Sequence, residues 1–156
     1  SHFTGFDYHP ASVAAAREQA AREGLSDRVS FDVGAAQQVP MQGFDLACCF
    51  DCLHDMGDPT GAAARLHGAL KPDGTLMVVE PMARDRLEDN MNLVGRVYYA
   101  ASAMICTPAS LNQPGQAGLG AQAGPGRLSA VIRDGGFRDV RVAAETPFNM
   151  VLEARP

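Results

Sequence analysis

The sequence predicts an α/β domain with a mostly parallel sheet whose last strand runs antiparallel. Strand-like and helix-like segments alternate over the first eighty residues, which is typical of right-handed βαβ units. Near the end, two strand-like segments, 137–144 and 147–154, are separated only by Glu145 and Thr146. So short a link permits a hairpin but not a crossover, so the last strand must run antiparallel to its neighbour. The length of 156 residues suits one domain.

The composition of the chain excludes some classes of binding partner and some cellular locations. The chain is 46% hydrophobic and 20% charged with a net charge of -5, and no window holds a Lys/Arg cluster, so we expect no nucleic-acid partner. No apolar run is long enough to span a membrane, and no signal-peptide pattern precedes the first strand. Three of the four cysteines crowd together at Cys48, Cys49 and Cys52, which is unlike a disulfide framework and favours a reducing, cytoplasmic location. Ser1-His2 is left out of the fold reasoning as a cloning remnant.

The first third of the chain predicts a strand, a helix and a second strand. Residues 3–7 are apolar and end on an acid, and an alanine-rich amphipathic helix follows over 10–23, closed by Gly24. Residues 28–33 alternate as a second strand, which Gly34 ends.

The stretch 44–59, FDLACCFDCLHDMGDP, organises the rest of the chain. Residues 44–50 predict a strand buried on both faces, followed by a loop over 51–58. Asp58 is the expected N-cap of the next helix, and Pro59 its first residue.

After that helix, which we expect over 60–70, the sequence Lys71-Pro72-Asp73-Gly74 predicts a turn. Residues 75–79 predict another fully buried strand, which delivers Glu80 to the same sheet edge as the loop 51–58.

Residues 81–125 depart from the α/β alternation. Apolar residues recur at helical spacing over 85–106, and 113–126 is rich in Gly, Gln and Ala. We interpret 81–125 as a helical cover and substrate insertion with a mobile segment at its end. A short helix is then expected over 126–135.

The loop 51–58 and Glu80 carry the predicted chemistry, because ligands of open α/β sheets bind outside the carboxyl ends of the strands. His54 is a competent base at neutral pH, since an unperturbed histidine titrates near ~6.5. Glu80 ends a strand about 4.8 Å from the neighbouring one, so its carboxylate can reach and orient the imidazole. Asp55 is the alternative orienting acid, and the alternative role of His54 is to cap the following helix.

Two further features have competing interpretations. Asp7 ends a strand, where a carboxylate can accept both hydroxyls of a ribose, or can be a solvated turn residue. Cys48, Cys49, Cys52 and His54 are residue types that bind zinc, but Cys48 and Cys49 face opposite sides of a strand. We therefore predict small buried hydrophobic residues and no metal.

In this order and spacing the segments resemble the class I S-adenosylmethionine-dependent methyltransferases. The resemblance rests on the acid Asp7, on GFDYHPASVAAAREQA, FDLACCFDCLHDM and ALKPDGTLMVVEP, and on the reversed C-terminal hairpin strand. It implies a Rossmann-like methyltransferase sheet, with residues 3–156 as a partial methyltransferase domain, and S-adenosyl-L-methionine as cofactor.

His54-Asp55 followed by Asp58 looks like the His-Asp-Trp-x-Asp loop of small-molecule O-methyltransferases. In that family the histidine removes the proton from a substrate hydroxyl, so the resemblance implies that His54 is the general base. Met56 stands where the family usually has tryptophan, and we count it with the cofactor-binding residues.

The resemblance also implies the cofactor contacts. It assigns Asp7 to the ribose, Tyr8 to the adenine and Asp51 to the amino-acid end of the cofactor. The acid that usually holds the adenine amino group is replaced by Gly34 and Ala35, so adenine recognition there would depend on backbone groups.

Four residues of the helical insertion are expected to line a substrate pocket or, alternatively, to pack in a core. They are Met91, Tyr98, Tyr99 and Met104.

The chain departs from the family pattern at two further points. Nothing before Phe3 can supply the family's first strand with its glycine-rich loop, and Gly126, before Arg127, replaces a second orienting acid. We therefore interpret the chain as a fragment of a longer enzyme, with the first strand missing. The exposed inner edges of strands 3–7 and 44–50 should pair directly or be covered by another copy, which predicts a homo-oligomer, a dimer in the simplest case.

The function predicted from these residues is O-methylation of a small hydroxylated apolar or aromatic substrate. The alternative is a catalytically silent binding or assembly module, or a fragment of a regulator, built on the same fold. A nicotinamide-dependent dehydrogenase shares the ribose acid, but the terminal hairpin and the His-Asp loop disfavour it.

Overall fold

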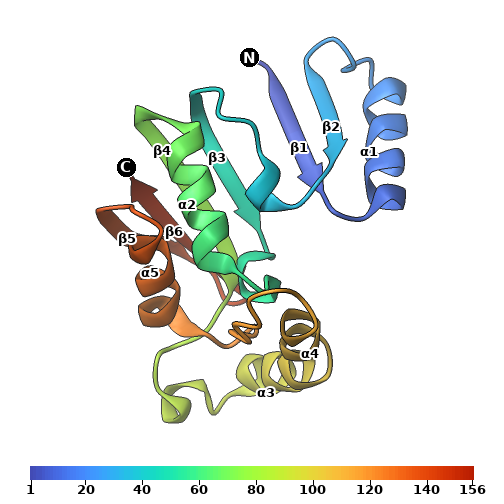
Figure 1. Ribbon diagram of the computed structural model, residues 1–156. Helices are drawn as coiled ribbons and strands as arrows, with labels where there is room; N and C mark the ends of the chain where they lie inside the picture. The colour runs from blue at the N-terminus through green and yellow to red at the C-terminus, as the bar shows by residue number, and fades with distance from the viewer. The chain divides into compact units, whose positions relative to one another are not determined.

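The computed structural model describes all residues 1–156, which form two compact units, Ser1–Pro40 and Met41–Pro156 (Figure 1). Each unit contains its own sheet, one of two strands and one of four. The α/β class is confirmed.

The unit Ser1–Pro40 is a parallel strand pair with one helix. Strand β1 (Phe3–Asp7) pairs with β2 (Val29–Val33), and α1 (Pro10–Arg22) connects them as predicted. Gly24 ends the helix region with φ of +66°, a left-handed conformation that favours glycine. A single 3-10 turn, η1 (Ala36–Gln38), follows β2.

The sheet of the unit Met41–Pro156 has the strand order β3-β4-β6-β5. Its strands are β3 (Phe44–Phe50), β4 (Leu70–Pro81), β5 (Asp139–Glu145) and β6 (Asn149–Arg155). Strands β3 and β4 are parallel, whereas β6 is antiparallel to both β4 and β5. The antiparallel C-terminal strand predicted from the short link is therefore confirmed.

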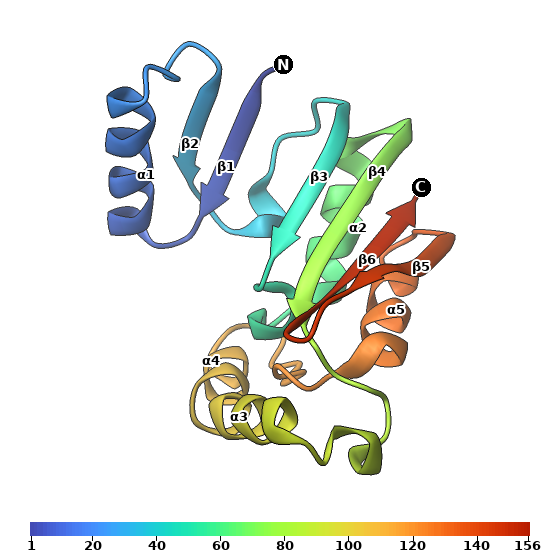
Figure 2. The same cartoon turned by 180° about the vertical axis from the view of Figure 1, so that it is seen from behind.

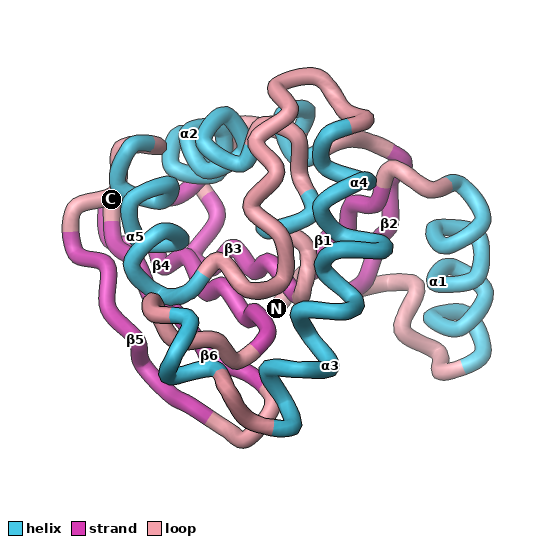
Figure 3. Tube along the Cα trace, turned by 90° about the horizontal axis from the view of Figure 1, so that it is seen from below, coloured by secondary structure: helices cyan, strands magenta, loops and turns pink.

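Two helices, α2 (Pro59–Ala69) and α5 (Gly124–Asp134), lie over one face of this sheet (Figure 3). Asp58 caps α2 as predicted, because its Oδ1 accepts a hydrogen bond from Gly61 N at 2.8 Å. The core between helices and sheet is aliphatic, with Leu66, Leu76, Val78, Leu128, Ile132 and Leu152 all buried.

The prediction that residues 44–50 are buried on both faces is wrong. Cys49 is buried, whereas Leu46 is 51% and Phe50 65% exposed. Alternate residues of a strand face opposite sides, and the helices α2 and α5 lie over only one face of the sheet (Figure 3). Residues 75–79 of β4 follow the same pattern, with Leu76 and Val78 buried and the residues between them half-buried, so the prediction of a fully buried strand is also wrong.

The predicted turn at 71–74 lies inside β4. Phe44 pairs with Leu70 and Leu46 pairs with Thr75, so the four residues 71–74 lie opposite Asp45 alone. The Lys71 ammonium donates to Asp45 Oδ1 at 2.6 Å across this irregularity. The Pro-Asp-Gly sequence therefore bends a strand rather than ending it.

The segment after β4, where helical spacing was noted over 85–106, contains several short helices. They are η3 (Leu87–Asn90), α3 (Leu93–Ala101), the π-helical η4 (Ser102–Cys106) and α4 (Thr107–Leu111). The buried Asn90 side chain holds the first bend, since it accepts from Arg84 N and donates to Arg84 O, both at 2.8 Å. Asn92 then caps α3 by accepting from Gly95 N at 2.9 Å.

Helices α3 and α4 lie beyond the carboxyl ends of β3 and β4 (Figure 2). None of the helices combines the length and the apolar character that crossing a bilayer requires.

Candidate active site

The loop after β3 begins with a tight backbone bend. Asp51 N donates to Val79 O at 2.8 Å, which continues the pairing with β4 by one residue. Asp51 itself has φ of +53°, a left-handed conformation that aspartate adopts more readily than most residues. The chain then enters the 3-10 turn η2 (Leu53–Asp55), which carries His54.

The His54 imidazole and the Glu80 carboxylate form a buried pair at this sheet edge. Glu80 is 0% and His54 2% exposed. One carboxylate oxygen, Oε2, lies against His54 Nδ1, and the other, Oε1, accepts from Leu53 N at 2.9 Å. Glu80 therefore holds both the ring of the histidine and the backbone just before it.

The second ring nitrogen of His54 has a different environment. His54 Nε2 lies 3.1 Å from Asp55 Oδ1, but no hydrogen bond of ordinary geometry ends on that buried oxygen. The interaction between these two atoms is therefore electrostatic, and Nε2 makes no hydrogen bond.

Opposing effects set the basicity of His54. Burial alone would lower the pKa of His54, but the hydrogen bond and charge of Glu80, with the charges of Asp55 and Asp51, raise it above its ordinary value. The ring is therefore more basic than a free histidine.

The cysteines lie around this pair without forming the zinc cluster considered from the sequence. Cys49 is buried as predicted, but Cys48 is exposed, so the prediction of a small buried residue at Cys48 is wrong. Neighbours on a strand face opposite sides, and only the side of Cys49 is covered. A hydrogen bond with Cys49 lowers the pKa of Cys52, and burial together with Asp55 raises the pKa of Cys106 to about 11.

Ligand-type atoms of His54 lie within 4.8 Å of those of Asp55 and Cys106, and also of those of Asp51 and Glu80. His54 and Glu80 are already bonded to each other, and we assign no metal ion to these groups.

The predicted ribose and adenine contacts lie in the unit Ser1–Pro40. Asp7 is exposed at the end of β1, and its Oδ1 accepts from His9 N at 2.8 Å, which holds the carboxylate at the strand end. Tyr8 is exposed beside it. The N–H of Gly34 donates to Asp7 O at 3.0 Å and that of Ala35 to Gln38 Oε1 at 3.0 Å, so the backbone donors there are already bonded.

The predicted substrate residues separate into two groups. Met91 is 80% and Met104 72% exposed, and Tyr99 is also exposed. Tyr98 donates its hydroxyl to Phe148 O at 2.9 Å, and burial with the nearby charge of Asp51 raises its pKa. Of the four, Tyr98 is the one that the structure brings near the His54 loop.

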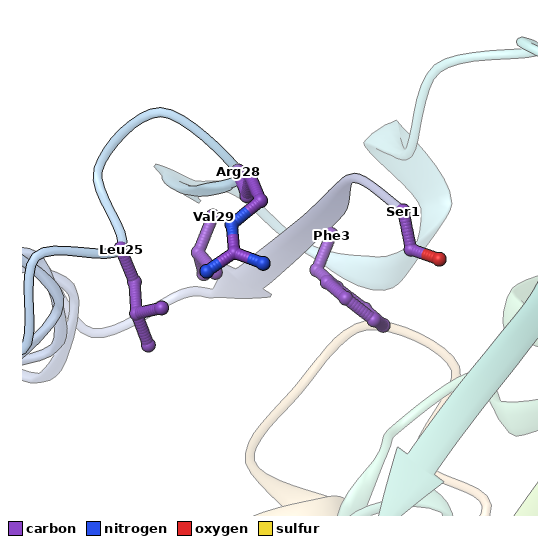
Figure 4. Close-up of a pocket in the computed structure, with 5 residues that line it drawn as sticks. All are labelled: Ser1, Phe3, Leu25, Arg28 and Val29. Carbon is purple, nitrogen blue, oxygen red and sulfur yellow. The ribbon is translucent and has the colours of Figure 1, made fainter.

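The unit Ser1–Pro40 contains a pocket that is not lined by any of the predicted site residues. It has a volume of about 320 Å³ and is lined by Ser1, Phe3, Leu25, Arg28 and Val29 (Figure 4). Arg28 is the one ionisable side chain among them, and its Nε lies 3.8 Å from Asp27 Oδ1. We assign no function to this pocket.

Sequence reasoning missed the residues that hold the His54 loop from outside. Ser110 is fully buried and donates to Met56 O at 2.7 Å, and Gln113 donates to Asp55 O at 2.8 Å. Both lie at or before the start of the segment 113–126, which we interpreted as mobile. The only signal in the sequence was Pro114-Gly115, which predicts a turn but not which segment the turn contacts.

The profile of a family described as a methyltransferase domain matches residues 1–133. The chain belongs to this methyltransferase family. The match covers β1 to α5 and therefore includes the His54 loop, Glu80 and the helical insertion.

Solved structures agree with this methyltransferase domain in fold. An O-methyltransferase family protein from Burkholderia thailandensis matches with a TM-score of 0.70 and 19% identity, covering 98% of this chain and 42% of that one. Human N-acetylserotonin methyltransferase in complex with SAM matches with a TM-score of 0.68 and 22% identity, covering 99% and 40%. The [4+2]-cyclase SpnF matches with a TM-score of 0.69 and 18% identity, covering 99% and 66%.

The methyltransferase chain spans 53% of the length of one matched structure, from Bordetella parapertussis, and 43% of another, PigF with SAH. The predicted resemblance to class I S-adenosylmethionine-dependent methyltransferases is confirmed, as are the sheet with its antiparallel last strand and S-adenosyl-L-methionine as the cofactor of this class. The cyclase shows that the fold alone does not determine the reaction.

Proposed function

We propose that the protein transfers a methyl group from S-adenosyl-L-methionine to a hydroxyl of a small apolar or aromatic substrate, with His54 as the general base. The observation that carries the proposal is the buried His54–Glu80 pair, in which Nδ1 is bound and Nε2 carries no hydrogen bond. Several of the matched structures are O-methyltransferases by description, which supports the choice of oxygen as acceptor.

Glu80 determines which nitrogen of His54 acts. A carboxylate accepts from Nδ1–H, which fixes the tautomer with its lone pair on Nε2. Because the carboxylate also accepts from Leu53 N, the carboxylate that binds the ring is itself held in place. Nε2 is then the atom that removes the substrate proton, and Glu80 stabilises the resulting imidazolium.

The reaction requires little more from the protein than this base and correct alignment. When bound, S-adenosyl-L-methionine supplies a methyl group already activated by its sulfonium. The chain contributes alignment of the substrate oxygen and removal of its proton. Asp55 adds negative charge near Nε2, which favours the imidazolium formed on proton transfer.

The cofactor would be held by the residues predicted from the sequence. Asp7 presents an exposed carboxylate for the ribose hydroxyls, with Tyr8 for the adenine. Asp51 and Met56, on the loop after β3, would contact the amino-acid end. Since the N–H groups of Gly34 and Ala35 are occupied, a backbone contact to the adenine amino group there would use a carbonyl.

The organisation of this chain follows from the same interpretation. Residues 3–156 form a partial methyltransferase domain, with 81–125 as the helical cover that bounds the substrate site through Tyr98. The apolar side chains of β3 left exposed in the unit Met41–Pro156 support association with another copy.

The test is turnover of a panel of small phenols and hydroxylated aromatics by the full-length protein, measured as S-adenosylhomocysteine released. His54→Gln should lower kcat about 100-fold or more, in the range of general-base catalysis, while calorimetric affinity for S-adenosylhomocysteine is retained. His67→Gln is the matched control, because His67 lies on α2, where its ring packs against Phe137 at 5.1 Å.

The outcomes separate the proposal from its alternative. Unchanged turnover in His54→Gln removes His54 as the base. Cofactor binding without turnover on any acceptor, in the unaltered protein, would instead support the catalytically silent binding or assembly module.

A further inference from the structure

The end of α4 and the segment that follows it bind the backbone of residues 54–57 of the His54 loop. Each of the four residues 54–57 is bonded through a backbone group to the stretch 110–120. The bonds are Gly120 N to His54 O at 3.2 Å, Gln113 Nε2 to Asp55 O at 2.8 Å, Ser110 Oγ to Met56 O at 2.7 Å, Gly57 N to Gln113 Oε1 at 3.1 Å and Ala117 N to Gly57 O at 2.9 Å.

Gln113 is the centre of this network, because both ends of its carboxamide are used. Its Oε1 accepts from Gly57 N, while its Nε2 donates to Asp55 O and, at 3.1 Å, to Ala109 O. This one side chain therefore binds Asp55 and Gly57, on either side of Met56, and links them to Ala109 in α4.

Ser110 supports the same arrangement from a fully buried position. Its hydroxyl donates to Met56 O and accepts from Gly118 N at 3.0 Å. The hydroxyl therefore links the loop to the far end of the stretch 110–120.

The two backbones also pack without side chains between them. A Cβ on Gly57 would lie 2.5 Å from Pro114 O, and one on Gly115 would lie 2.5 Å from Gly57 O. Such contacts are closer than real Cβ atoms make, so this approach requires glycine on both sides. The hydrogen bonds and the close packing together fix the position of the loop.

We propose that Gln113 is a positioning residue, which holds the backbone of 55–57 and so aims the His54 imidazole between Glu80 and the substrate. The proposal rests on the proposed function for its catalytic consequence, although the placement of the imidazole can be measured without turnover. Gln113 does not touch the imidazole, so its effect passes through the loop.

The titratable groups around His54 determine how its pKa would respond if the loop were less tightly held. Glu80 faces the ring from β4, and Asp51, Cys52 and Asp55 from its own loop. Cys106 faces it from η4. Glu80 makes the largest contribution that favours the protonated ring, and that contribution depends on contact between the two side chains. Loss of the contact should therefore lower the pKa of His54 towards the ordinary value of a histidine.

The experiment compares Gln113→Ala with Gln116→Ala in the full-length protein. Gln116 lies in the same stretch, but its side chain is exposed and makes no bond to the loop. Gln116→Ala is therefore the same chemical change without the loss of those bonds. The first readout is the pKa of His54 by NMR of protein with carbon-13-labelled histidine, its signal assigned with His54→Gln. We expect Gln113→Ala to lower that pKa and Gln116→Ala to leave it unchanged.

The second readout is kinetic. Gln113→Ala should lower kcat by roughly 10- to 100-fold, as small misplacements of a catalytic group do, with the KM for the cofactor changed less than kcat. Should Gln113→Ala fail to fold, Ser110→Ala carries the same test, since its hydroxyl binds the same loop.

An unchanged His54 pKa in folded Gln113→Ala or Ser110→Ala would overturn the proposal, as would an unchanged kcat in an active enzyme. Failure of the proposed function looks different, because the unaltered protein would then lack turnover while the pKa still responded to Gln113→Ala.

Discussion

The two compact units hold their predicted functional residues in very different ways. In the unit Met41–Pro156, His54 and Glu80 are buried, bonded to each other and held by backbone contacts. In the unit Ser1–Pro40, Asp7 and Tyr8 are exposed on a two-stranded sheet. The acid and base groups are therefore preorganised by packing, whereas the predicted cofactor contacts are surface groups.

The cores of the two units differ in the same direction. The larger unit buries a set of large aliphatic side chains, including Leu76, Leu128 and Leu152, but the smaller unit buries only Val13, Ala20 and Val39. The difference teaches that substitutions in the larger unit should act through stability and catalysis together, and those in the smaller unit mainly through binding.

The largest effect is expected from Glu80→Ala. It leaves the imidazolium and the Leu53 N–H buried without their acceptor, which should lower the free energy of unfolding by about 3–5 kcal/mol. Urea denaturation measures it. Glu80→Gln is the control, since it keeps an acceptor for Leu53 N, and a loss as large as that of Glu80→Ala would show that the charge alone matters.

The next effect concerns packing. Leu152→Ala, at a fully buried position of β6, should cost about 2–5 kcal/mol. Val13→Ala in the smaller unit should cost less, because it removes fewer buried carbon atoms at roughly 0.8 kcal/mol per methylene. Equal costs in denaturation experiments would break the comparison of the two cores.

A smaller effect, on binding, is expected from Asp7→Asn. A lost hydrogen bond to a charged group, worth about 1.5–3 kcal/mol, should weaken the affinity for S-adenosylhomocysteine roughly 10- to 100-fold, with thermal stability unchanged. Asp32→Asn is the control, because Asp32 is an exposed acid on the neighbouring strand whose Oδ1 lies 3.4 Å from Arg17. Equal weakening by both variants, measured by calorimetry, would remove the specific role of Asp7.

The smallest effect is the pH dependence contributed by His54. Its pKa is raised in the folded state, so the folded protein binds this proton more tightly than the unfolded chain. That stabilisation is fully present below the ordinary histidine pKa of about 6.5 and is lost as the pH rises through the raised folded value. Denaturation at a series of pH values should show this loss in the wild type, and a smaller one in His54→Gln. An identical slope in both would exclude His54 as its source.

The positions of the strands could be predicted because their signals are local. Residues 3–7 and 44–50 were predicted with the bounds that β1 and β3 have, since apolar runs end there at acids and glycines. The pairing of Glu80 with His54 followed from parallel strands ending at one edge, which is a property of topology rather than of side chains.

The rest required the three-dimensional structure. Exposure of Leu46 and Phe50 depends on which face the helices cover, and composition does not record that. The bonds of Ser110 and Gln113 join irregular backbone far apart in sequence, which carries no periodic signal. The bend at 71–74 has the composition of a turn, but the flanking residues continue the same strand.

The bonds around the His54 loop have a consequence for exchange with solvent. Leu53 N donates to Glu80 Oε1 and Gly57 N to Gln113 Oε1, so two amide protons of a loop are enclosed on opposite sides of the histidine. Amide hydrogens in loops usually exchange with deuterium quickly, because local opening costs little there. At these two positions exchange should require the loop to separate from Glu80 or from the stretch 110–120, so the loop should exchange as slowly as the strands beside it.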